Sequence, residues 1–109
     1  MQVAVIHTAF EDTPRTVAFV DVPDGTDAMD ACEYAYRWTN NVMGSWSIKE
    51  KTLELSNGET MENGDYNDAV TVMAPLHEGG MGLRSTSMGD QMLVGNKKYK
   101  VAMFGFEAV

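Results

Sequence analysis

Basic residues are scarce in this chain. Eight lysines and arginines stand against sixteen aspartates and glutamates in 109 residues, which gives a formal net charge of −8. Three of the bases, Lys97, Lys98 and Lys100, lie in one short segment. A nucleic-acid-binding face needs clustered positive charge to neutralise phosphates, so direct nucleic-acid binding is disfavoured. The acidity is typical of a highly soluble protein or of one that binds a basic partner protein.

Cysteine and long apolar runs are also nearly absent. The single cysteine, Cys32, excludes an intramolecular disulfide framework and favours a reducing compartment. No apolar run approaches the roughly 20 residues that span a bilayer, so we expect no membrane contact. The first ten residues contain His7 and no basic leader, which is a poor match to a signal peptide. These features predict a cytoplasmic protein.

No recognisable set of catalytic or metal-binding residues is present. His7 and His77 are the only histidines, and neither has a further ligand at metal-site spacing. The acids between Glu59 and Asp68 lack the ligand order and central glycine of an EF-hand loop. No serine lies in a nucleophile-elbow sequence. We therefore predict no metal, no cofactor and no enzymatic activity.

Short apolar segments separated by turn residues run through the chain. Residues 2–7 and 16–22, with Pro14 between them, are typical of a β-hairpin. The stretch from Asn57 to Tyr66 holds two Asn-Gly dipeptides and predicts a polar loop or a short irregular hairpin. Further strands are expected at residues 51–55, 69–74, 91–94 and 99–106, with a bulge at Gly105.

One principal helix is predicted at about residues 27–41. Thr26 or Asp27 can cap its N-terminus. Glu33 and Arg37 are spaced for an i,i+4 ion pair on its polar face. An apolar stripe at helical spacing marks the face that is expected to be buried, and its members are Ala28, Ala31, Cys32, Ala35, Trp38 and Val42.

The order of these elements predicts the fold class. Two strands precede the helix and four or so strands follow it, which indicates an α+β fold. We expect a mainly antiparallel sheet of five to seven strands packed on the principal helix. With 109 residues, 44% of them apolar, the chain is long enough for one core, so residues 1–109 should form a single globular domain.

The segment from Gly79 to Ser87 is the strongest candidate for a small-ligand site. Gly79, Gly80 and Gly82 could point backbone N–H groups at an anion, and Arg84 with the following hydroxyls could complete a phosphate nest. A P-loop would need a helix after the loop, whereas a strand is expected here. The alternative interpretation is a mobile linker followed by a hydrogen-bonded turn.

Trp46 has two interpretations of its own. It follows the helix in a Gly-Ser loop, off the apolar stripe. It either fills the end of the core or stands at the surface as a contact residue. The nine methionines are likewise typical of adaptable core filling or of an interface.

Two segments resemble a known family. They are EYAYRWTNNVMGSWS (Glu33 to Ser47) and RSTSMGDQMLVGNKKYKVAMFGFEAV (Arg84 to Val109). Their Arg-x-Thr-Asn helix end, Gly-Ser-Trp, Arg-Ser-Thr-Ser-x-Gly-Asp and closing Tyr-x-Val-Ala-x-x-Gly-Phe resemble small YodL-like domains of bacteriophages, plasmids and conjugative elements. The resemblance implies an accessory protein of a mobile element, in the company of counter-defence modules. It supplies no catalytic residue to carry over.

The leading hypothesis is a small acidic phage or mobile-element protein that binds and inhibits a host protein, such as a component of a CRISPR or restriction system. Its partner would offer a basic, nucleic-acid-binding surface. One alternative is a phosphate- or nucleotide-binding domain, or a small enzyme, that uses the segment from Gly79 to Ser87. Another is a minor virion protein or homo-oligomer. If the helix end and the Ser-x-Gly-Asp turn meet in space, the partner-binding surface is expected to contain Arg37, Asn40, Asn41, Trp46, Arg84, Ser85, Ser87 and Asp90.

Overall fold

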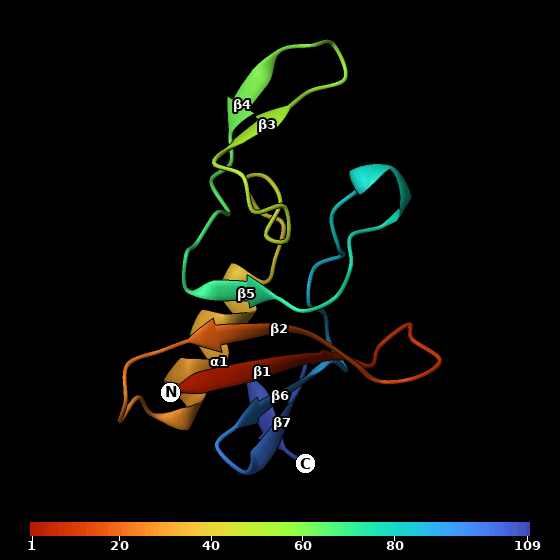
Figure 1. The fold of residues 1–109 in the computed structure, drawn as a ribbon. Coiled ribbons are helices and arrows are strands. Elements are labelled where there is room, and N and C mark those ends of the chain that lie inside the picture. Colours follow the sequence, from red (N-terminus) through yellow and green to blue (C-terminus); the bar gives the residue numbers. More distant parts are fainter.

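In the computed structural model, which describes residues 1–109, six strands form one antiparallel sheet with α1 against one face (Figure 1). The sheet order is β5-β2-β1-β6-β7-β8, and the strands β3 and β4 form a separate hairpin. The predicted α+β class with a mainly antiparallel sheet is confirmed. The elements are β1 Gln2–His7, β2 Arg15–Asp21, α1 Ala28–Trp38, β3 Thr52–Glu54, β4 Thr60–Glu62, β5 Val70–Val72, a 3-10 turn Glu78–Gly80, β6 Gln91–Val94, β7 Lys97–Val101 and β8 Phe106–Ala108.

The core lies between α1 and the middle of the sheet. β1 pairs with β2 on one side and β6 on the other, and its residues Val3, Ala4 and Val5 are all buried. The face of α1 toward the sheet is made of small side chains, Ala31, Cys32 and Ala35, and all three are buried. Small residues let the helix axis approach the strands closely, so the larger Trp46 and Met92 can fill the space at the sides.

The helix begins as predicted and ends earlier. Asp27 is its N-cap and accepts a hydrogen bond from the Met29 N–H at 3.1 Å. The helix stops at Trp38, so Val42, which was predicted to belong to the buried apolar stripe, lies beyond the helix and is 62% exposed. The prediction of a Glu33–Arg37 ion pair is also wrong, because Arg37 pairs with Asp65 at 3.1 Å instead.

The C-terminal strand predicted at residues 99–106 is two strands. β7 ends at Val101, the chain turns, and β8 pairs antiparallel with β7. The turn is closed by a hydrogen bond of 2.9 Å from the Ala102 N–H to the Gly105 carbonyl. Gly105 has φ 70° and therefore serves the turn, where a left-handed backbone favours glycine, and not a bulge.

The hairpin of β3 and β4, called the arm below (residues 50–62), stands away from the six-stranded sheet (Figure 1). Residues 57–66 contain one strand of this hairpin, β4, and its partner β3 lies before them, so the hairpin is not contained within 57–66 as one of the two predictions had it. Asn63 holds the base of the arm: its side-chain amide donates to the carbonyls of Ser45, Ile48 and Glu50 at 2.9, 3.2 and 3.0 Å. No helix in the protein combines the length and apolar character that crossing a membrane requires.

Candidate functional site

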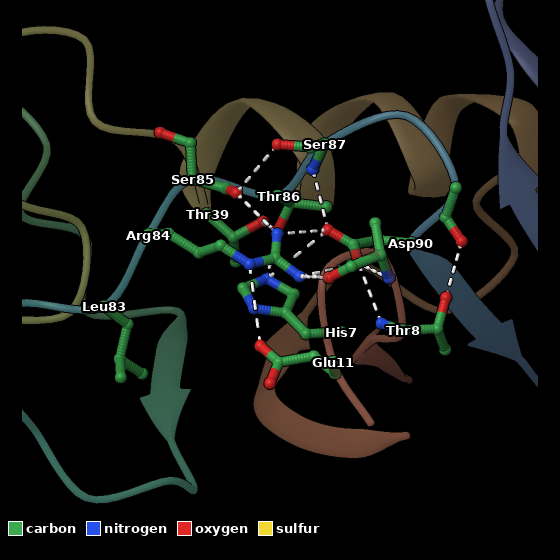
Figure 2. A network of polar contacts seen from close by, with 12 residues as sticks. His7, Thr8, Glu11, Thr39, Leu83, Arg84, Ser85, Thr86, Ser87 and Asp90 are labelled. Carbon is green, nitrogen blue, oxygen red and sulfur yellow. Dashed lines mark hydrogen bonds and ion pairs between the residues drawn. The ribbon is translucent and has the colours of Figure 1, made fainter. Parts of the chain in front are cut away.

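Two carboxylates, Asp65 and Asp90, are fully buried, and each faces an arginine. Asp65 accepts three hydrogen bonds and Asp90 accepts five. Figure 2 shows the surroundings of Asp90. Its Oδ1 accepts from the backbone N–H groups of Thr8 and Ala9 at 2.8 and 2.9 Å, and its Oδ2 accepts from the Ser87 N–H at 2.8 Å. The Ser-x-Gly-Asp turn therefore ties the end of β1 to the segment before β6.

Arg84 completes the coordination of Asp90. Its Nη1 lies 2.7 Å from Oδ2 and its Nη2 lies 3.0 Å from Oδ1, which is the bidentate geometry that guanidinium and carboxylate groups favour. Burial alone would raise the pKa of Asp90, but the hydrogen bonds from Arg84 and three backbone N–H groups outweigh it and hold that pKa below its ordinary value. The same pairing raises the pKa of Arg84.

His7 connects this ion pair to the helix. Its Nε2 lies 3.0 Å from the Thr86 hydroxyl and 3.9 Å from Asp90 Oδ2. The Thr86 hydroxyl meets the Thr39 hydroxyl at 2.8 Å, and Thr39 donates to the Ala35 carbonyl of α1 at 2.7 Å. Burial lowers the pKa of His7 to about 4 despite the opposing charge of Asp90, so the imidazole is neutral at neutral pH.

The helix exit and the Ser-x-Gly-Asp turn do meet in space. The Asn41 N–H donates to Ser85 Oγ at 2.8 Å, and the indole N–H of Trp46 donates to the Arg84 carbonyl at 2.9 Å. Asn41 also accepts from the Trp46 N–H at 3.0 Å. These residues, predicted as one group, are joined by hydrogen bonds inside the protein.

The prediction that all of these residues share one exposed surface is wrong. Trp46 and Asp90 have no solvent exposure, so Trp46 fills the core and cannot be a surface contact residue in this conformation. Arg37 is engaged with Asp65, and the Asn40 side-chain amide donates to the Tyr36 carbonyl at 2.6 Å. Ser87 donates to the Ser85 carbonyl at 3.1 Å. Trp46 and Asp90 belong to an internal joint between α1 and the sheet, whereas Asn41 is exposed and the other five residues of the group are half-buried.

A pocket of about 310 Å³ lies beside the Arg84–Asp90 pair. His7 and Leu83 contribute buried side chains to it, and its remaining lining is Phe10, Glu11, Arg15, His77 and Arg84. The glycines 79, 80 and 82, predicted to form a phosphate nest, do not line it. Sequence reasoning missed the contribution of the β1–β2 loop, because nothing in that loop resembles a ligand-binding motif.

The arm presents a second surface. All four of its glutamates are exposed, and the arm contains one base, Lys51. A second pocket of about 310 Å³ at its base is lined by Met43, Met61, Glu62 and Gly64. Exposed Met61 thus lies on the same projecting element as these glutamates, and exposed Met43 lies beside it at the base of the arm. No three His, Cys, Asp or Glu side chains are grouped so that they could hold a metal ion.

Comparison with protein-family models, with curated proteins and with solved structures found no match to this chain.

Proposed function

We propose that the protein acts by binding another protein, and that the arm makes the contact. The observation that carries this proposal is the separation of the arm from the sheet, together with its charge. Glu50, Glu54, Glu59 and Glu62 stand against Lys51, so residues 50–62 carry a net charge of −3. Such a surface is complementary to a basic patch, which it would attract over a distance of about 10 Å at ordinary salt.

Apolar contact area lies beside these charges. Met43 is 58% exposed, Met61 is 36% exposed, and the two line the pocket at the base of the arm. Methionine is enriched at interfaces because its flexible side chain adapts to the partner surface. Acidic residues would steer the encounter, and the methionine pocket would receive an apolar side chain of the partner.

The finer proposal concerns the identity of the partner. The resemblance to YodL-like domains favours a host protein in the bacterial cytoplasm, and specifically a component of a CRISPR or restriction system. Those proteins carry basic surfaces that neutralise nucleic-acid phosphates. By occupying such a surface, the arm would exclude the nucleic acid, and the protein would inhibit its partner without any chemical step.

The experiment is affinity purification of the tagged protein from host lysate, followed by mass spectrometry and repeated with two variants. The arm variant E54Q/E59Q/E62Q removes three exposed charges, and the control D12N/D21N/E107Q removes three exposed charges elsewhere. We expect a captured protein that the arm variant loses, that the control retains, and whose capture weakens as salt rises. Equal capture by both variants would contradict the proposal.

A homo-oligomer or virion component remains the alternative of another class. Size-exclusion chromatography with light scattering distinguishes it, because a stable oligomer would elute at a multiple of the 12.0 kDa chain mass. If the protein forms an oligomer that depends on the arm and captures no host protein, the arm serves self-assembly and the present proposal is wrong.

A further inference from the structure

Phe10 has an unfavourable backbone conformation at the edge of the pocket beside Arg84. It has φ 63° and is the one non-glycine residue with positive φ in the protein. It is the third residue of a turn closed by the Glu11 N–H and the Thr8 carbonyl at 3.2 Å. Glycine or asparagine normally occupies such a position, because a bulky side chain is strained there. Residues held in this way are concentrated at functional sites.

The side chain of this strained residue is exposed to solvent. Phe10 is 86% exposed, so core packing does not explain why a large aromatic residue occupies the position. Its ring nevertheless lies against the pocket, and the guanidinium carbon of Arg84 is 5.3 Å from the ring centroid. The ring is therefore available to stack on a planar group.

Asp90 and Arg84 hold the backbone of the turn from Thr8 to Glu11 in place. Asp90 accepts from the Thr8 and Ala9 N–H groups, and Arg84 Nη2 donates to the Ala9 carbonyl at 2.5 Å. The bidentate ion pair thus fixes both the turn and the arginine that lies in the pocket. The joint between the Ser-x-Gly-Asp turn and β1 positions Phe10 in front of Arg84.

The polar lining supplies both signs of charge. Arg15 and Arg84 are cationic, and Glu11 is anionic. Arg84 Nε is buried without a hydrogen-bond partner, because the nearest Glu11 oxygen lies at 3.6 Å, longer than a hydrogen bond. The Nη atoms of Arg84 already donate to Asp90 and to backbone carbonyls, so Arg15 is the cation left for a ligand. A ligand that satisfies this lining has an anionic group for Arg15, an N–H donor for Glu11 and a planar ring for Phe10.

We propose that this pocket binds a mononucleotide. The phosphate lies against the exposed guanidinium of Arg15, the base stacks on Phe10, and an N–H group of the base donates to Glu11. The volume of about 310 Å³ is at the small end of the range of ligand pockets, which suits one nucleotide and not a dinucleotide. This site is separate from the arm, so the inference does not depend on the proposed protein partner.

The test is isothermal titration calorimetry of the protein with each common ribonucleoside monophosphate, with the matching nucleosides and with inorganic phosphate. We expect at least one nucleotide to bind, and its nucleoside and phosphate alone to bind about tenfold more weakly or not at all. Phe10→Asn removes the stacking ring and Arg15→Gln removes an exposed cation. Each should weaken nucleotide binding about tenfold, in keeping with one base–aromatic stack or one phosphate contact. Lys98→Gln, an exposed cation on β7 outside the pocket, should have no effect.

Loss of folding cannot mimic this result, because Phe10 and Arg15 are exposed and asparagine tolerates the left-handed backbone. Circular dichroism of each variant provides the check. The proposal is overturned if no nucleotide binds at millimolar concentration, or if inorganic phosphate binds as tightly as the nucleotide. It is equally overturned if Phe10→Asn and Arg15→Gln both bind like the unaltered protein.

Discussion

Arg84 and Asp90 form a two-point ion pair, with distances of 2.7 and 3.0 Å, across the turn that precedes β6. The pair links three parts of the chain that are remote in sequence. Asp90 accepts from two residues that follow β1. Arg84 donates to the Ala9 carbonyl through its guanidinium and accepts the Trp46 indole N–H on its own backbone carbonyl. The stability of the protein should therefore depend strongly on this pair.

Asp90→Asn should lower the free energy of unfolding by about 3 kcal/mol, because it leaves the Arg84 charge without its partner and turns an amide toward backbone donors. Urea denaturation measures the change. The control is Glu107→Gln, an exposed carboxylate on β8, which should change stability by less than about 0.5 kcal/mol. A loss at Asp90 no larger than that of the control would show that the ion pair does not stabilise the fold.

The buried imidazole of His7 should make the fold sensitive to mild acid. Its pKa in the folded protein is about 4, below the ordinary value of 6.5, so the unfolded chain binds a proton first as pH falls. The contribution of neutral His7 to the free energy of unfolding is then fully present above about pH 6.5. It is lost as the pH falls toward about 4, by on the order of 3 kcal/mol.

His7→Gln removes the titrating group and keeps a polar side chain that can reach the Thr86 hydroxyl. Denaturation curves from pH 7 to pH 4 should therefore be flatter for this variant than for the unaltered protein. The lowered pKa of Asp90 adds a further loss, but only where pH falls below the ordinary carboxylate range. Identical pH dependence of the two proteins between these limits would contradict the role of His7.

Phe10→Asn should stabilise the protein by about 1 kcal/mol, because asparagine adopts φ 63° with less strain than phenylalanine. The gain would appear as a higher Tm. Phe104→Asn is the matched control: Phe104 is also an exposed aromatic residue in a turn, but it does not have positive φ. If both substitutions change the Tm alike, backbone strain at Phe10 is not the cause.

The parts of the fold that were predicted correctly depend on local sequence. The β1–β2 hairpin follows from an apolar run on each side of Pro14, and the start of α1 follows from Asp27 and the alanine stripe. β8 was missed because the turn before it interrupts an apolar segment, and Met103 and Phe104 in that turn do not resemble turn residues. Residue type alone does not predict a reversal at such a place.

The candidate site was harder to predict because it is assembled by tertiary contacts. Contact between the Ser-x-Gly-Asp turn and the helix end was a condition of the predicted surface and did not follow from the sequence. Burial of Trp46 was one of two interpretations, and the burial of Asp90 could not be inferred from its polar neighbours. Phe10 carried no local signal, since phenylalanine is among the residues least expected at positive φ. An acid three residues after Ser87, preceded by glycine, was the one hint that a carboxylate could cap the backbone there.

Asn63→Ala should loosen the arm more than the sheet. The Asn63 side chain donates to three carbonyls, and its oxygen accepts from the Ser45 N–H at 3.0 Å. Loss of these bonds leaves buried polar groups unsatisfied, at a cost of about 2 kcal/mol or more. Hydrogen exchange should therefore accelerate in β3 and β4 well before it does in β1 and β6.

Asn57→Ala provides the control for that measurement, because Asn57 lies in the turn of the same hairpin and accepts a single exposed bond from the Glu59 N–H at 3.0 Å. It should leave exchange at the base of the arm unchanged. Since a two-stranded hairpin alone is barely stable in water, the arm depends on its attachment at Asn63 to present its glutamates in one orientation. Equal exchange rates in the two variants would mean that the arm is held by contacts other than those of Asn63.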